Sequence, residues 1–165
     1  MRSSSAVMRI SIGWSKTRRN DALIGAFPSD GDINFVTQFA RPLPQQVMAE
    51  VLGFPDTDIP QLAAWDEAQV MPFVYGEGHL NRLTDKQLAA QFAQLEGFKE
   101  YVQEIVSCKR RTPAEDMISF LTQVKYSALD RKLSDLEING IAYAMVLGGL
   151  ETTQYALDQQ AQLIC

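Results

Sequence analysis

The spacing of apolar residues constrains this chain more than any other feature of its sequence. From Asp30 to Cys165 these residues recur at intervals of three and four, the period that places side chains on one face of an α-helix. Segment 34–52 shows the pattern with Phe35, Phe39, Leu43, Val47, Val51 and Leu52. Strand-like alternation of useful length does not occur in the same region. The chain is therefore predicted to be all-α.

Prolines, glycines and turn residues divide this pattern into separate helices. Pro42 and Pro44 predict a short extended or kinked step within segment 34–52, because proline lacks an N–H and disfavours helix in the residue before it. Gly53 is placed to end that helix. The next residues, 55–58, have the sequence Pro-Asp-Thr-Asp and supply turn and N-cap chemistry for a short second helix.

The second helix is predicted to continue through Val70, and the glycine-rich, polar segment 72–82 is typical of a loop. Thr84 and Gln87 then have the spacing of a capping box, in which two side chains satisfy each other's backbone N–H groups. The long helix that follows is predicted to reach about Arg111, with basic residues in its last turn.

Two further start signals occur in the C-terminal third. Thr112 and Pro113 predict a new helix, with the threonine as N-cap and the proline in the first turn. Ser134 and Glu137 form a second potential capping box, and the apolar pattern then runs to the C-terminus. A last helix of about 30 residues is predicted there.

The first 20 residues differ in composition from the rest. They hold five basic residues and no acidic one, whereas the remaining 145 residues carry 10 basic and 20 acidic residues. Their serines and arginines are also found in transit peptides, but Arg9 interrupts the apolar stretch and argues against a secretory signal. We expect residues 1–30 to form an atypical basic, poorly ordered segment, and residues 31–165 to form the helical domain.

Composition argues against several functions. The net charge of −5 has the wrong sign for a protein that grips nucleic acid. Cys108, Cys165 and His79 are too few for a Cys/His zinc cluster or a disulfide framework, which favours a reducing, cytoplasmic location, and His79 is expected in a solvated loop. The longest apolar run, Ile141–Leu150, is half the length of about 20 residues that a membrane span needs.

The last predicted helix contains the unusual segment 148–153, Gly-Gly-Leu-Glu-Thr-Thr. Each interior glycine costs about 1 kcal/mol relative to alanine, so some other interaction or function must compensate. Thr152 lies four residues after Gly148 and can bond its carbonyl, which predicts a locally opened helix with a groove at the glycines. Two alternatives remain open for the segment: proton relay by Glu151 and Thr152, or close helix packing at the glycines.

Segment 148–153 resembles the oxygen-binding helix of the cytochrome P-450 haem-thiolate monooxygenases, whose pattern is Ala/Gly-Gly-x-Asp/Glu-Thr-Thr/Ser. Three other stretches, in the same order, are similar to those of bacterial soluble members: 39–44 with 51–58, 110–119, and 133–138. The resemblance covers residues 31–165. It implies an all-α, partial cytochrome P-450 fold that extends from the middle helices through the long oxygen-binding helix.

This resemblance implies roles for residues of the last helix. Glu151 and Thr152 are similar to the acid and alcohol that deliver protons during oxygen activation. Gly148 and Gly149 would then flank the oxygen groove. One turn earlier, Ala144 and Leu147 would line the substrate pocket.

The same resemblance implies a haem cofactor, a small organic substrate and insertion of one oxygen atom of O2. Electrons would come from NAD(P)H through a ferredoxin-type or flavoprotein donor. The family's haem-ligand cysteine lies in a glycine-rich loop, and neither Cys108 nor Cys165 has such a loop around it, so no axial metal ligand is expected in this chain. We expect an internal fragment that is inactive alone. The alternative is a helical interaction module without catalysis.

Overall fold

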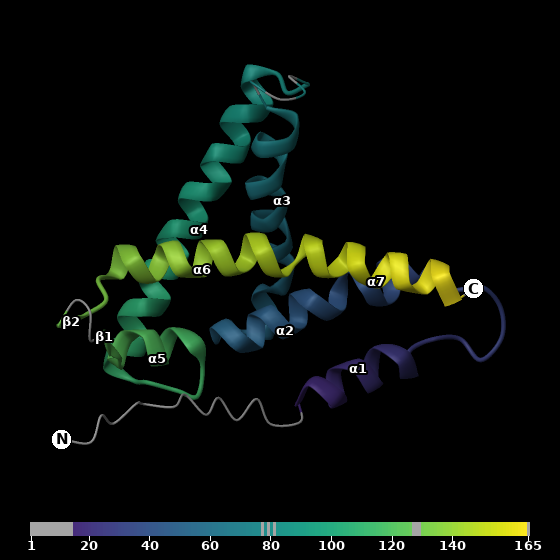
Figure 1. Cartoon of the computed structure of the whole chain (residues 1–165), viewed down its shortest axis with the longest axis horizontal. Helices are drawn as coiled ribbons and strands as arrows, with labels where there is room; N and C mark the ends of the chain where they lie inside the picture. Colours follow the sequence, from purple (N-terminus) through teal and green to yellow (C-terminus); the bar gives the residue numbers. More distant parts are fainter. Residues whose placement is uncertain (1–14, 77, 79, 81, 127–129, 165) are drawn as a thin grey trace.

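The computed structural model describes residues 15–76, 78, 80, 82–126 and 130–164, which are mostly helical (Figure 1). In chain order, the helices are α1 (Ser15–Gly25), the π-helix η1 (Val36–Ala40), α2 (Pro42–Leu52), the 3-10 helix η2 (Asp56–Asp58), α3 (Ile59–Tyr75), α4 (Asp85–Arg111), α5 (Met117–Gln123), α6 (Asp135–Gly149) and α7 (Glu151–Ile164). Two-residue strands β1 (Lys125–Tyr126) and β2 (Arg131–Lys132) pair antiparallel. The all-α prediction is confirmed.

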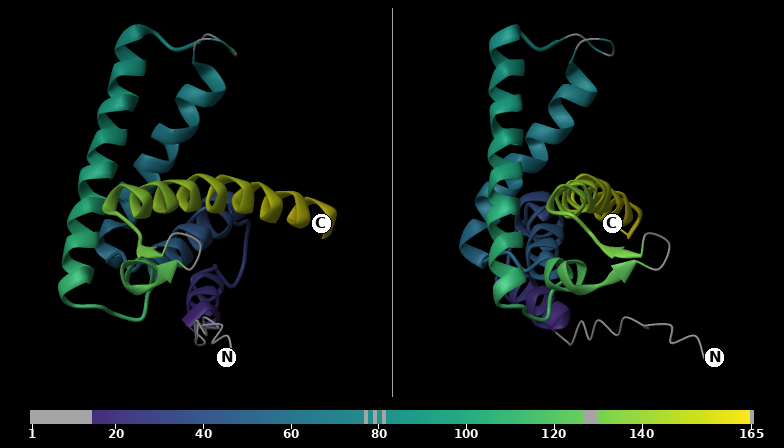
Figure 2. Two further views of the ribbon diagram at one scale, coloured as in Figure 1. Left: turned by 60° about the vertical axis from the view of Figure 1, so that its left-hand side comes forward. Right: turned by 90° about the vertical axis from the view of Figure 1, so that its left-hand side faces the viewer.

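Helices α6 and α7 run end to end as a nearly continuous rod, on which the rest of the fold is arranged (Figures 1 and 2). Helices α3 and α4 form an antiparallel pair that rises from this rod and is joined at its far end by segment 76–84. Helix α2 contacts α3 and α6, while α5 and the β1–β2 pair lie near the start of α6.

Helix α4 is central to the core because it contacts α3, α5 and α6. Its apolar residues Phe98, Val102 and Val106 are fully buried, and their spacing of four residues places them on one face of the helix. They pack in one hydrophobic cluster with residues from the surrounding helices, which include Leu52, Leu62, Trp65, Ile118, Ile138, Ala142 and Val146. Asn139 adds a polar link between helices, since its Nδ2 donates to the Lys99 carbonyl at 2.8 Å.

Both predicted capping boxes are present. At the start of α4, the Thr84 N–H donates to Gln87 Oε1 at 3.0 Å, and the Gln87 N–H donates back to Thr84 Oγ1 at 3.3 Å. At the start of α6, Ser134 and Glu137 make the same two bonds at 2.8 and 3.3 Å. These bonds satisfy N–H groups that have no partner inside a helix, so they define the two helix starts.

Replacing Ser134 with alanine is expected to lower the free energy of unfolding by about 1 kcal/mol, because the Glu137 N–H loses its acceptor. Urea unfolding followed by circular dichroism measures this change. Ser107→Ala is the matched control, since Ser107 is exposed near the C-terminal end of α4 and is not a cap residue. Equal effects of the two substitutions would contradict the capping role.

Two predictions about helix boundaries need correction. The segment is divided as predicted, because η1 ends and α2 begins at Arg41, but the step is not extended: Arg41 stays helical, and Pro42 and Pro44 lie in the first turn of α2, where a missing N–H breaks no helical bond. Helix α3 is not short and continues through Pro72 to Tyr75. Pro72 removes a single helical bond, and packing of α3 against α4 offsets that loss.

A third correction concerns Thr112, which ends α4 instead of starting the next helix. The N-cap of α5 is Asp116, whose Oδ1 accepts from the Ser119 N–H at 2.7 Å. Its other oxygen accepts from Lys109 Nζ at 2.5 Å. Asp116 is preferred over Thr112 as the N-cap of α5, because its carboxylate caps that helix and also pairs with a cation of α4. Gly53, as predicted, ends α2 in the left-handed conformation with φ of 80°.

Part of the atypical N-terminal segment is helical. Helix α1 contacts α2, and Arg19 donates to Glu50 at 2.8 Å and to Asp56 at 2.9 Å. These ion pairs attach residues 15–25 to the domain, which differs from the expectation of a poorly ordered segment there. The residues before Ser15, and His79 in the predicted loop, lie outside the described residues. Among the described helices, none combines the length and apolarity needed to cross a bilayer.

Candidate functional site

The predicted opening of the last helix lies at Leu150, which separates α6 from α7. Thr152 Oγ1 donates to the Gly148 carbonyl at 2.6 Å, the bond that the sequence spacing predicted. The helical direction is nevertheless kept, since the Leu150 N–H still reaches the Val146 carbonyl at 3.3 Å. The break is therefore local, and α7 continues the line of α6.

Four of the predicted site residues share an exposed stripe along α6 and the first turn of α7. Ala144, Leu147, Gly148 and Thr152 are all exposed and are spaced by one helical turn or less. A Cβ added at Gly148 would meet nothing within 4 Å. The stripe therefore exposes helix backbone and small side chains at Ala144 and Gly148, and it ends at the hydroxyl group of Thr152.

Gly149 does not belong to that stripe. It packs against α2, where a Cβ on Gly149 would collide with Met48 Cε. The two adjacent glycines therefore have different surroundings: Gly148 leaves open space on the exposed face, while Gly149 permits close contact between α6 and α2. Close helix packing, one of the two alternatives for the segment, thus applies to Gly149. Proton relay by Glu151 and Thr152 stays a prediction.

Alanine substitutions should separate the two glycines. Gly148→Ala is expected to raise the free energy of unfolding by up to about 1 kcal/mol, since alanine favours helix and the site is open. Gly149→Ala should be less stable than Gly148→Ala by about 1 kcal/mol or less, because the terminal methyl group of the flexible Met48 side chain must move aside. Urea unfolding of both variants measures the difference. Equal stabilities would show that Gly149 is not closely packed.

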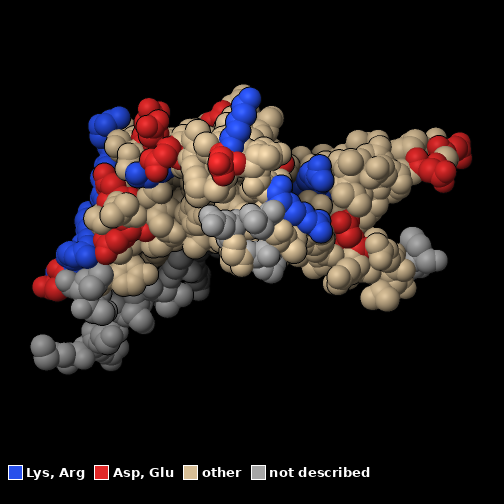
Figure 3. Space-filling view, turned by 90° about the horizontal axis from the view of Figure 1, so that it is seen from above, with Lys and Arg blue, Asp and Glu red and all other residues tan. Residues whose placement is uncertain are grey.

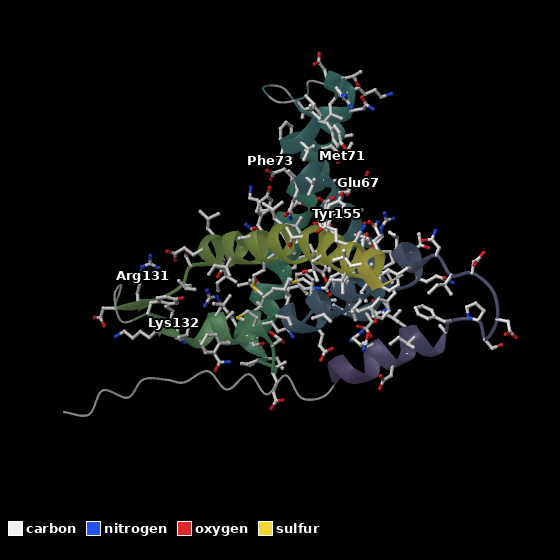
Figure 4. The ribbon with its side chains drawn as sticks, turned by 45° about the vertical axis from the view of Figure 1, so that its right-hand side comes forward. Glu67, Met71, Phe73, Arg131, Lys132 and Tyr155 are labelled. Atoms are coloured by element: carbon white, nitrogen blue, oxygen red, sulfur yellow. The ribbon has the colours of Figure 1, made fainter. Side chains whose placement is uncertain are left out.

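Glu151 is half-buried and faces a pocket of ≈ 730 Å³ between α3 and α7, which we call the α3–α7 pocket. Its charged lining residues are Arg41, Asp66, Glu67 and Glu151, and its apolar or aromatic ones include Val70, Met71, Val74, Tyr75 and Tyr155. Figure 4 shows Glu67 and Met71 of α3 on the side of the molecule where Tyr155 projects from α7. The pocket thus combines carboxylates with an apolar surface.

Burial raises the pKa of Glu151, and the negative charge of Glu67 adds to this effect, while the nearby Arg41 guanidinium opposes it. Glu151 therefore keeps its proton to a higher pH than an ordinary glutamate. Thr152, the next residue, is on the exposed stripe. The two residues that the sequence singled out therefore differ in their surroundings: Glu151 lines the α3–α7 pocket, and Thr152 lies on the exposed stripe.

Asp66 is the site residue that the sequence analysis missed. It is 8% exposed, and its Oδ1 has no hydrogen-bond partner among the described residues. Burial, followed by the negative charges of Glu151 and Glu67, raises its pKa to about 7. The sequence does indicate that Asp66 is buried, since Leu62, Trp65, Asp66 and Gln69 have the i, i+3, i+4, i+7 spacing of one helix face.

Metal ligands are not brought together in the described part of the chain, where no group of three His, Cys, Asp or Glu side chains could hold an ion. Cys108 is exposed on α4, and Cys165 lies outside the described residues. On the face shown in Figure 3, acidic and basic side chains are interspersed. That surface lacks the broad basic area expected of a nucleic-acid-binding protein.

Comparisons with known proteins identify the fold. No protein-family profile matches the chain. Cytochrome P450 BJ-3 of Bradyrhizobium diazoefficiens is 30% identical over 151 residues, covering 92% of this chain and 34% of the relative. Cytochrome P450(MEG) of Priestia megaterium is 32% identical over 139 residues, covering 83% of the chain and 32% of the relative.

A solved structure agrees with these relatives. CYP109E1 of Bacillus megaterium, determined in complex with corticosterone, superposes with a TM-score of 0.72 at 28% identity, covering 89% of this chain and 38% of that one. The chain spans about a third of the length of the curated relatives it matches. Over the region that it spans, the chain belongs to the cytochrome P450 family.

Proposed function

We propose that this chain forms the distal wall of a haem pocket in a monooxygenase that inserts one oxygen atom of O2 into a small organic substrate. The observation that carries the proposal is the exposed stripe of α6, which ends at the Thr152 hydroxyl. Family membership supports it. The electron supply from NAD(P)H through a ferredoxin-type or flavoprotein donor, and a cytoplasmic location, belong to the same proposal.

The stripe fits one face of a haem group. Ala144 and Gly148 carry no side chain larger than a methyl group, and the space beside Gly148 is open, so a flat macrocycle can approach the helix backbone. The stripe itself offers no thiol, because Cys108 lies on α4, so the chain would be inactive without residues beyond those of the stripe. Haem supplies the redox chemistry when bound, and the protein supplies positioning and proton delivery.

In this proposal Glu151 and Thr152 move protons between the two sides of the α6–α7 rod. The raised pKa of Glu151 favours the protonated form that a proton donor needs. The Thr152 hydroxyl donates its hydrogen to the Gly148 carbonyl, which orients the oxygen lone pairs and leaves them able to accept a proton. Leu147 and Ala144 would contact the substrate one turn earlier.

The Thr152→Ala substitution tests the relay in a chimera in which residues 31–164 replace the corresponding segment of the 32%-identical Priestia megaterium relative. Haem content should be retained, while the fraction of consumed O2 released as peroxide should rise several-fold, since general acid catalysis contributes about 10²-fold or more to such steps. Oxygen uptake, peroxide and product are measured together.

Thr153→Ala is the matched control for this experiment, because Thr153 is also exposed at the start of α7 but makes no bond to Gly148. Its coupling of oxygen uptake to product should equal that of the unsubstituted chimera. Unchanged coupling in Thr152→Ala would remove Thr152 from the relay. The alternative, a helix-packing module, predicts that the chimera binds no haem at all.

A further inference from the structure

The α3–α7 pocket contains more negative charge than its neighbours balance. Asp66 and Glu67 of α3 and Glu151 of α7 line it together with one cation, Arg41, from the turn between η1 and α2. Neither Asp66 nor Glu67 forms a salt bridge with any described residue. Most of the described basic side chains near α4 and α6 are already paired with other acidic residues. Three carboxyl groups and a single guanidinium group thus line one pocket.

Asp66 gives an independent indication that the pocket takes a ligand. Its side chain is more than nine-tenths buried, it lines the pocket, and its Oδ1 lacks a hydrogen-bond donor among the described residues. A buried polar atom without a partner is unfavourable by about the strength of one hydrogen bond, so such groups are rare in folded proteins. Since Oδ1 itself is closed off, a donor that entered the pocket would bond the other oxygen of this carboxyl group, which also makes no hydrogen bond with a described residue.

The shape and lining of the pocket define the class of donor. A volume of ≈ 730 Å³ lies within the usual range of about 300–1,000 Å³ for small-molecule sites. The carboxylates do not converge as metal ligands do, since no described group of three could hold an ion. Further along the same two helices, the pocket is lined by Val70, Met71, Val74 and Tyr155, which suit an apolar or aromatic body.

We propose that the α3–α7 pocket binds a protonated organic amine, with its ammonium group on Asp66 and Glu67 and its apolar body against Met71 and Tyr155. An ammonium group has the three N–H donors and the positive charge that this site lacks. Binding needs only the residues of the pocket, so it goes beyond the proposed monooxygenase activity and does not depend on haem.

The test is isothermal titration calorimetry of the chain, without haem, with 4-phenylbutylamine and with its uncharged counterpart 4-phenylbutan-1-ol. At pH 8 the amine is expected to bind about tenfold or more tightly than the alcohol, the ratio that a charge-assisted hydrogen bond contributes. At pH 5.5 the ratio should fall, because Asp66, whose pKa is raised to about 7, is then protonated. Arg41, Glu67 and Glu151 line the same pocket as this carboxyl group. Equal affinities of the amine and the alcohol at pH 8 would overturn the proposal.

Asp66→Asn should bring the affinities of amine and alcohol within about threefold of each other at pH 8, because the neutral amide removes the charge at constant volume. Glu104→Gln, on the exposed face of α4, removes one negative charge elsewhere and should keep the tenfold ratio. An unchanged ratio in Asp66→Asn overturns the proposal. If Asp66→Asn does not fold, the same titration is made with Glu67→Gln. An amine-to-alcohol affinity ratio equal to that of the unsubstituted chain then overturns the proposal.

Discussion

Replacing Phe98 with alanine is expected to lower the free energy of unfolding by about 3–5 kcal/mol, the largest loss that we predict for a single side chain. Phe98 is 1% exposed in the centre of α4. Its ring lies 5.3 Å from that of Trp65 on α3 and 6.3 Å from that of Tyr143 on α6, measured between centroids. The substitution would therefore leave a cavity where three helices meet.

Urea unfolding of Phe98→Ala measures this loss, and Phe92→Ala on the same helix is the control. The Phe92 side chain is 53% exposed, so its removal is expected to change stability by much less, about 1 kcal/mol or below. Because small domains are stable by only about 5–15 kcal/mol, the Phe98 variant should be partly unfolded at modest urea concentrations. Similar losses for both variants would contradict the assignment of the core.

The second large effect concerns pH. The pKa of Asp66 is raised to about 7 from the ordinary 3.8, first by burial and then by the charges of Glu151 and Glu67. Between these two values the folded chain binds this proton and the unfolded chain does not. The stabilisation is therefore fully present below about pH 4 and is lost as the pH rises through 7.

The loss corresponds to a shift of about three units and so amounts to at most about 4 kcal/mol. Unfolding free energies measured from pH 5 to pH 8 should fall with rising pH, and Asp66→Asn should flatten most of this dependence. Glu151, whose pKa is also raised by burial, contributes a remaining slope of the same sign. Glu104→Gln should keep the full slope, and a flat profile of the unsubstituted chain would exclude an ionisable group buried at Asp66.

Local features of the fold were predictable because they depend on residues a few positions apart. The two capping boxes and the Thr152 bond to Gly148 follow from the spacing of the residues that make them. Predictions at Pro72 and Thr112 failed for the opposite reason. At these positions a contact with another helix, or a competing cap such as Asp116, outweighed the local preference.

The site was predictable only along one helix. The sequence placed Glu151 and Thr152 at a break in the last helix, and the structure has its break at Leu150. Asp66 was missed, although its position on the apolar face of α3 marked it as a buried carboxyl. Its role could not be predicted, because that role depends on Glu67 and Glu151 lining the same pocket, and Glu151 comes from a distant part of the chain.

By itself, the sequence determined the all-α class, the starts of α4 and α6, and the backbone opening after Gly148. Hydrogen bonds within one or two helical turns set these features, so they need no knowledge of the rest of the fold. Only the tertiary structure decided that Gly148 is open while Gly149 packs on Met48, and that three carboxylates share one pocket. Those properties arise where α2 packs on α6 and where α3 and α7 line one pocket, and packing between distant segments is not encoded in the spacing of neighbouring residues.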